Sequence, residues 1–147
     1  MSTRGTAYFE IRETKSDAPV RVGRLGIPRD GYPSGFGLFM CGLIDGVYIS
    51  ETDGKMDKFC FRNVERAILH ITYGFPTSPY DEDEYLYRFI FTLQNQSGKC
   101  YPISDVLEIE IKHKYGSNNF KGTFEEFKVL CGYSDETKNE GLYWLST

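Results

Sequence analysis

Apolar and polar residues alternate in two stretches near the start of the chain. The first runs from Thr6 to Glu13 and the second from Val20 to Ile27, with a turn at Lys15 to Pro19 between them. Alternation with a period of two is typical of strands that bury one face, because successive side chains of a strand point to opposite sides. The pattern therefore predicts an N-terminal β-hairpin.

Further strands are predicted in the second half of the chain. The strongly aromatic stretch from Tyr85 to Gln94 predicts a strand, and a turn at Asn95 to Gly98 leads to Lys99 to Ile103 as its hairpin partner. Val106 to Lys114 alternates again, and a final strand is predicted from Leu142 to Leu145. One face of the Val106 to Lys114 strand is expected to carry Leu107, Ile109, Ile111 and His113. His113 is therefore expected to be a strand-end residue on or near the core face rather than a catalytic base.

Helical patterns occur between these strands. Apolar residues recur at helical spacing from Asn63 to Tyr73, and Asn63 is a good N-cap. Phe36 to Ile44 predicts a short helix, and the Asp45-Gly46 pair predicts a turn after it. Thr123 and Glu126 have the spacing of a capping box, which predicts another short helix.

These elements define the expected fold class. A chain of 147 residues is in the common size range of one domain and buries about two-thirds of its unfolded surface. We therefore expect residues 1–147 to form a single α+β domain with a mainly antiparallel sheet and two or three short helices. The 11 Tyr and 11 Phe suit cross-strand pairs, although aromatic side chains could also line a pocket for a flat ligand.

The charge balance narrows the choice of partners. A formal net charge of -4 argues against a protein that holds extended nucleic acid by many phosphate contacts. Residues 1–35 nevertheless carry six Lys or Arg against four Asp or Glu, so the excess of acid lies in the rest of the chain. A local anion site near the N-terminus is one interpretation, and ordinary solvated strand residues are the other.

Cysteine spacing and hydropathy bear on metals and location. Four cysteines are widely separated, without a Cys-x-x-Cys pair or a histidine at ligand spacing: Cys41, Cys60, Cys100 and Cys131. We therefore expect no metal site, and the apolar surroundings of most of these thiols suit a reducing compartment. No basic and apolar leader and no apolar run of about 20 residues occurs, which predicts a cytoplasmic protein without a membrane partner.

Catalytic and cofactor motifs are missing from the sequence. His70 and His113 are the only histidines, and neither belongs to a known catalytic pattern. No Gly-x-Ser-x-Gly elbow, Rossmann fingerprint or Walker loop is present. We therefore expect no catalytic residues, no cofactor and no enzyme activity, and a hydrolase or phosphodiesterase using Asp30 with a histidine ranks last.

A glycine-rich loop from Arg29 to Gly37 is the strongest candidate for a binding site. Its glycines permit close backbone approach, its backbone N–H groups could hold an anion, and nearby arginines would add positive charge. The alternative is that Asp30 caps the turn and Tyr32 packs it. The candidate ligand-binding residues are Arg4, Arg24, Arg29, Asp30, Gly31, Tyr32, Ser34 and Gly35.

The Ser2 to Gly5 segment, read together with Asp30 to Gly35, resembles a family of small uncharacterised proteins of bacteriophages and bacteria. Members typically open with Thr-Arg and carry a His-Trp-Asp-Gly-Tyr-Pro loop after a strand. The segments Glu84 to Tyr87 and Gly122 to Phe127 are also similar. Pro28-Arg29 replaces the His-Trp pair here, so no role of that pair transfers, and the resemblance implies a phage-type setting rather than a mechanism.

Two functional hypotheses follow. The first is a phage-type cytosolic binding protein that acts in counter-defence by sequestering a small anionic, nucleotide-like immune signalling molecule. The alternative is an inhibitor that presents the acidic run Asp81 to Glu84 to a host factor such as a defence protein, and homo-oligomers are compatible with either. Charge reversal in the acidic run would abolish partner capture under the alternative and leave small-ligand binding unchanged.

Overall fold

The computed structural model of the protein describes residues 3–52, 58–60, 84–92, 100–102 and 106–142. Its centre is a five-stranded sheet with the strand order β2-β1-β4-β6-β7. The strands are β1 (Gly5–Arg12), β2 (Val20–Ile27), β4 (Tyr85–Thr92), β6 (Leu107–His113) and β7 (Phe120–Thr123). The other elements are η1 (Pro33–Gly37), α1 (Leu38–Thr52), α4 (Phe124–Cys131), η3 (Glu140–Leu142) and a separate two-stranded sheet of β3 (Lys58–Cys60) and β5 (Cys100–Pro102).

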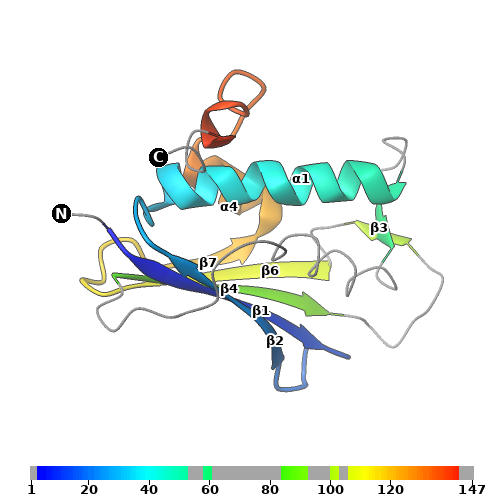
Figure 1. The fold of residues 1–147 in the computed structure, drawn as a ribbon. Helices are drawn as coiled ribbons and strands as arrows, with labels where there is room; N and C mark the ends of the chain where they lie inside the picture. Colours follow the sequence, from blue (N-terminus) through cyan, green and yellow to red (C-terminus); the bar gives the residue numbers. More distant parts are fainter. Residues whose placement is uncertain (1–2, 53–57, 61–83, 93–99, 103–105, 143–147) are drawn as a thin grey trace.

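The predicted α+β class is confirmed. Helices α1 and α4 lie on the same side of the sheet (Figure 1). Three of the four ladders in the sheet are antiparallel, and only β1 and β4 pair in parallel. The N-terminal hairpin and the strand that alternates up to His113 are both present. None of the helices in the described ranges is long and apolar enough to cross a membrane.

The core lies between the sheet and the two helices. Inward residues of neighbouring strands meet in one row, in which Phe9 of β1 pairs with Phe89 of β4 and Phe89 pairs with Ile109 of β6. The Phe9 and Phe89 rings stack at 5.2 Å, and Phe127 of α4 meets Phe89 edge to face at 5.9 Å. Burying each of these side chains contributes about 1.5–3 kcal/mol, so this aromatic layer is a main source of stability.

The predicted hairpin partner of the aromatic strand is wrong. Residues Lys99 to Ile103 were expected beside β4, but β5 pairs with β3, and the neighbours of β4 are β1 and β6. Hairpins are the commonest link between consecutive strands, so a sequence pattern favours local pairing. Both neighbours of β4 place apolar residues opposite it on the core side, and this burial decides the order of the strands.

Helix α1 is longer than the pattern predicted. A turn was expected at Asp45-Gly46, yet the helix begins at Leu38 and continues to Thr52. Turn propensity is a weak preference that packing overrides. The first half of α1 buries Phe39, Met40 and Ile44 in the core. This packing favours a helix that continues through Asp45-Gly46 over a turn.

The capping box before α4 is confirmed. The Thr123 hydroxyl accepts from the Glu126 N–H at 3.2 Å, and the Glu126 carboxylate accepts from the Thr123 N–H at 3.0 Å. At the other end Gly132 has a φ of 77°, the left-handed conformation that favours glycine at a helix C-terminus. Both ends of α4 are therefore specified by local sequence.

Some predicted elements lie outside the described residues. These are the helix from Asn63 to Tyr73, most of the acidic run and most of the final strand from Leu142 to Leu145. Leu142 itself ends the short helix η3.

Close packing of η1 against α4 can be tested by a substitution at Gly37. A Cβ at Gly37 would lie 2.6 Å from the Cys131 sulfur, whereas one at Gly42 in α1 would meet nothing nearer than 3.9 Å. We expect Gly37→Ala to lower the free energy of unfolding by about 1–3 kcal/mol through overpacking. The matched change Gly42→Ala should raise it by up to about 1 kcal/mol.

Urea denaturation followed by circular dichroism measures both changes. Equal stability of the two variants would contradict the packing described at Gly37.

Candidate functional site

The loop between β2 and α1 is tied to the N-terminal segment and to the core. Asp30 has a positive φ of 49°, which is uncommon for a residue other than glycine. The N–H of the buried Gly31 donates to the Thr3 carbonyl at 2.9 Å, and the Tyr87 hydroxyl donates to the Gly31 carbonyl. A Cβ at Gly31 would lie 3.2 Å from the Thr3 oxygen, so glycine suits this close approach.

Backbone donors of this loop are used inside the chain. The N–H of Gly35 donates to the Tyr32 carbonyl at 3.0 Å, and the N–H of Phe36 donates to the Asp30 carbonyl at 2.8 Å. The Gly31 N–H is also occupied, as described above. A ligand at the loop would therefore depend on side chains rather than on these three backbone donors.

Two polar side chains of the loop, Asp30 and Tyr32, interact with each other. Burial raises the pKa of Tyr32, and the charge of Asp30 and a hydrogen bond to it raise that pKa further. Tyr32 remains 38% exposed, and Ser34 is exposed in η1. Asp30 and Tyr32 thus have partners within the loop, as the alternative of a packed turn expects.

The three arginines of the predicted site lie at two places, the glycine-rich loop and the outer face of the sheet. Arg29 belongs to the loop, and the main chain of the exposed Arg4 lies beside it, because a Cβ at Gly31 would be 3.5 Å from the Arg4 carbonyl carbon. Arg24 instead stands opposite Tyr8 in the β1–β2 ladder, on the face of the sheet away from the core. Each of these arginines has an interaction partner in the structure.

Arg24 lines a shallow depression of about 350 Å³ together with Tyr8, Arg21 and Gly23. The guanidinium of Arg21 lies over the Tyr8 ring, with 3.6 Å between its central carbon and the ring centroid. The Arg21 side chain is 57% exposed, so part of it remains accessible to a ligand. The depression therefore combines two guanidinium groups with an aromatic ring.

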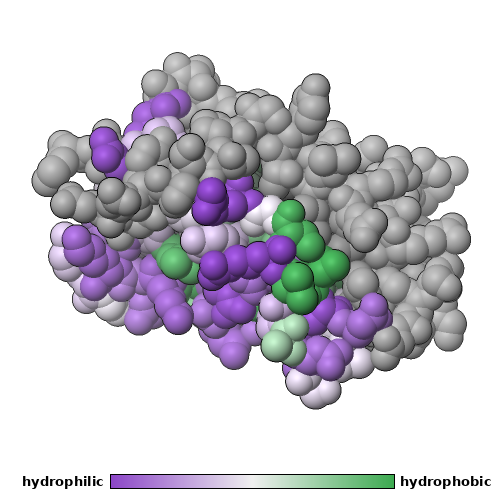
Figure 2. All heavy atoms as spheres, turned by 60° about the horizontal axis from the view of Figure 1, so that its bottom comes forward, coloured by the Kyte–Doolittle hydropathy of each residue, from purple (hydrophilic) through white to green (hydrophobic). Residues whose placement is uncertain are grey.

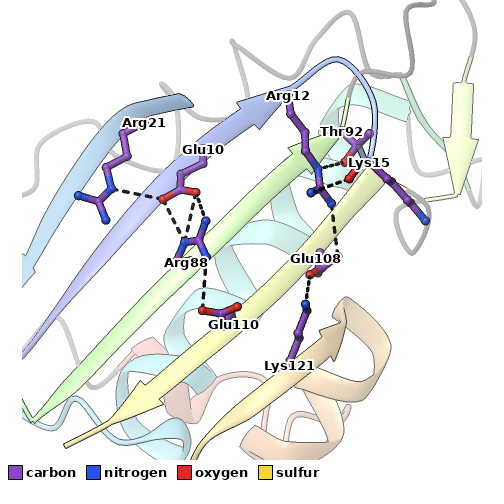
Figure 3. A network of polar contacts seen from close by, with 9 residues as sticks. All are labelled: Glu10, Arg12, Lys15, Arg21, Arg88, Thr92, Glu108, Glu110 and Lys121. Carbon is purple, nitrogen blue, oxygen red and sulfur yellow. Dashed lines mark hydrogen bonds and ion pairs between the residues drawn. The ribbon is translucent and has the colours of Figure 1, made fainter. Parts of the chain in front are cut away.

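An ion-pair network centred on a buried carboxylate contacts Arg21. Glu10 is 2% exposed, and its carboxylate accepts from Arg88 Nη2 at 2.6 Å and from Arg21 Nε at 3.3 Å. Arg88 also donates to Glu110 at 3.3 Å (Figure 3). Burial acts to raise the pKa of Glu10, but the hydrogen bonds and charges of Arg88 and Arg21 outweigh burial and lower it. The ionised Glu10 is thereby a shared acceptor for Arg88 and Arg21.

Arg12 forms a second cluster farther along β1. Its guanidinium donates to the Thr92 hydroxyl at 3.0 Å, to the Lys15 carbonyl at 3.3 Å and to Glu108 at 3.4 Å (Figure 3). Lys121 also pairs with Glu108, at 3.6 Å. These residues border a depression of about 240 Å³. Each guanidinium nitrogen of Arg12 has a partner. The cluster is therefore best explained as a structural connection between the β1–β2 turn and strands β4 and β6, not as a binding site.

The face of the sheet away from α1 and α4 is cationic, although the chain as a whole is acidic. Strand registers place six cations and three carboxylates on the described part of this face, an excess of three positive charges. Figure 2 shows the same face, where hydrophilic residues dominate the coloured area around a smaller hydrophobic cluster. The charged residues are Arg12, Arg21, Arg24, Arg88, Lys112, Lys121, Glu10, Glu108 and Glu110.

Comparison with known proteins finds no matching family model, no matching curated protein and no matching solved structure. The phage resemblance therefore stays a prediction. Within the described ranges, no group of three or more His, Cys, Asp or Glu side chains is placed to hold a metal ion. The function has to be inferred from the geometry of this chain.

Four residues of the polar face were not singled out from the sequence: Tyr8, Glu10, Arg21 and Arg88. Alternation in β1 places Tyr8 and Glu10 on one face, and the hairpin brings Arg21 opposite Glu10, so a local signal was present for three of them. Arg88 arrives through the parallel ladder with β4, which no local pattern indicates. The cationic face is therefore a product of long-range pairing.

The ion-pair network gives a pH-dependent prediction. Glu10→Gln should lower the free energy of unfolding at pH 7 by about 1–3 kcal/mol, because it removes a charged acceptor from two arginines. The pKa of Glu10 is lowered on folding, so its contribution is complete above the ordinary value of 4.5 and is lost as the pH falls below that. The stability difference between the two proteins should therefore shrink in acid.

Glu110→Gln is the matched control, since Glu110 contacts Arg88 at 3.3 Å. This substitution should lower the free energy of unfolding less than Glu10→Gln does. Chemical denaturation at a series of pH values measures all three proteins. A difference between wild type and Glu10→Gln that grows in acid would contradict the role given to Glu10.

Proposed function

We propose that the protein is a binding protein for a small anionic, nucleotide-like ligand, and that the depression around Tyr8, Arg21 and Arg24 receives it. The observation that carries this proposal is the pairing of two guanidinium groups with a stacked aromatic ring on the cationic face of an acidic chain. Arginine matches phosphate oxygens with two parallel N–H groups, which makes it suited to phosphorylated ligands.

Each residue of the depression has a distinct role in this proposal. Arg21 is stacked on Tyr8 and held by Glu10, so its outer plane offers a rigid surface on which a nucleobase stacks. Arg24 supplies charge for a phosphate. Gly23 has no side chain, which lets the ligand approach the edge strand β2 closely.

The resemblance to phage and bacterial proteins supports a setting for this activity. Sequestration of a nucleotide-like immune signalling molecule would keep that molecule from its effector, and this needs affinity without turnover. A ligand held in this way should be recovered intact after the protein is denatured.

The test is calorimetric titration with a panel of mononucleotides and cyclic dinucleotides. The double variant Arg21→Ala/Arg24→Ala should weaken binding at least about 30-fold, because charged hydrogen bonds contribute about 1.5–3 kcal/mol each. Arg4→Ala/Arg29→Ala is the matched control, since it removes the same charge from the loop and its N-terminal neighbour. We expect this control to bind as wild type.

Two results would overturn the proposal. Binding to none of the nucleotides would remove the ligand class, and loss of binding in the control with retention in the double variant would move the site to the loop. Mass spectrometry of the denatured, ligand-retaining protein identifies the ligand that remains bound.

A further inference from the structure

The turn between β6 and β7 carries a chain of three hydrogen-bonded side chains. Ser117 Oγ lies 3.0 Å from Nδ1 of His113, and Nε2 of the same ring lies 2.9 Å from Glu84 Oε2. The imidazole side chain is 5% exposed, whereas Ser117 is exposed. A hydroxyl, an imidazole and a carboxylate in this order are the parts of an activated serine.

The carboxylate determines the direction of these hydrogen bonds. An ionised Glu84 only accepts, so Nε2 of His113 carries a proton and donates it. In the neutral ring Nδ1 is then an acceptor, and the Ser117 hydroxyl donates to it. A general base needs this tautomer, because the unprotonated nitrogen faces the hydroxyl that is to be activated.

The His113 ring and the backbone of Glu84 are both anchored. The Glu84 N–H donates to the Arg4 carbonyl at 2.9 Å, and the Glu84 carbonyl accepts from the Lys114 N–H at 2.8 Å. The His113 ring stacks on Tyr85 at 4.4 Å and meets Tyr115 edge to face at 5.4 Å. These contacts fix the imidazole between Glu84 and the turn.

The turn also provides donors for a developing negative charge. Gly116 has a φ of 78°, which lets the chain fold back over His113, and its N–H donates to the His113 carbonyl at 2.9 Å. Within the described part of the chain, the backbone N–H groups of Ser117 and Asn118 donate to no carbonyl. Both residues are exposed, and exposed backbone N–H groups next to a nucleophile are the kind of donor that stabilises an oxyanion.

We propose that Ser117 is a nucleophile that His113 activates and Glu84 orients, and that its substrates are short acyl esters. Ser117 Oγ attacks the ester carbonyl carbon while its proton passes to Nδ1 of His113. The tetrahedral intermediate collapses, the bond to the alcohol oxygen breaks, and the alcohol leaves with that proton. Water then attacks the acyl-serine by the same route and releases the carboxylic acid.

The acyl group would lie against an exposed aromatic surface. Tyr115 is 70% exposed and its ring contacts the His113 ring at 5.4 Å, so it offers an apolar surface beside the base. An open turn accommodates a short chain better than a long one. The activity uses none of the residues of the nucleotide-binding depression and is independent of that proposal.

An alkyl fluorophosphonate tests the nucleophile directly, since a bond from Ser117 Oγ to phosphorus replaces the bond to fluorine. Intact-mass and peptide analysis should find one adduct, on Ser117. Ser117→Ala should abolish it, and Ser134→Ala should not change it, because Ser134 is an exposed serine that contacts Thr137 rather than a histidine. His113→Gln should slow the labelling at least about 100-fold, the scale of general-base catalysis.

Glu84 is a positioning residue and needs its own measurement. With p-nitrophenyl butyrate, Glu84→Gln should lower kcat at least about tenfold at unchanged KM, whereas loss of folding would be seen in the melting curve. The proposal is overturned if no adduct forms, if the adduct forms at another residue, or if folded His113→Gln labels Ser117 as fast as wild type. Retained labelling in Arg21→Ala/Arg24→Ala would separate this activity from ligand binding.

Discussion

Parallel pairing of β1 with β4 is the constraint on which the rest of the structure depends. On the core side it stacks Phe9 on Phe89 at 5.2 Å, and on the other side it places Arg88 2.6 Å from the buried Glu10. A slip of one residue would turn the phenylalanines outward and bury unpaired charges. Since an unpaired buried charge costs several kcal/mol, both faces select the same register.

The same register gathers chemically useful groups at one end of the sheet. Gly5, Tyr85 and His113 lie in one row across β1, β4 and β6. The residue before Tyr85 is Glu84, and its N–H donates to the carbonyl of Arg4. The glycine-rich loop leaves β2 at this end as well, and its Gly31 donates to Thr3. The loop and the serine, histidine and glutamate chain are therefore connected through a single N-terminal segment.

Sequence patterns predicted the parts of the fold that depend on neighbouring residues. The N-terminal hairpin, the alternation that ends at His113 and the capping box of Thr123 with Glu126 are all specified within short windows. The β1–β4 ladder joins residues about 80 positions apart, and no local pattern encodes that choice. The extent of α1 was missed for a related reason, since burial against the sheet overrode the turn preference of Asp45-Gly46.

The residues of the candidate sites also divide into those that local sequence patterns indicate and those that depend on long-range pairing. Arg24 and the loop were visible in the sequence, because clustered glycines and an excess of arginine are local features. The role of Arg88 and the hydrogen-bonded chain of Ser117, His113 and Glu84 could not be predicted from the sequence. Arg88 belongs to β4 and Glu84 precedes it, so both depend on long-range pairing. His113 was correctly placed on the core face, but its carboxylate partner depends on the β4–β6 register.

The glycine-rich loop shows why such segments are ambiguous. A Cβ at Gly35 would lie 2.4 Å from the Asp30 carbonyl oxygen, and Gly31 is pressed against Thr3, so close packing alone requires small residues here. The N–H groups that would make a nest for an anion instead donate to carbonyls of the chain. On the cationic face Glu10 holds Arg21, whose guanidinium lies over the Tyr8 ring, and Arg24 adds the second guanidinium of the depression. Recognition of an anion therefore follows better from the arginine side chains of the sheet, one of which a buried carboxylate holds, than from the glycines that first suggest it.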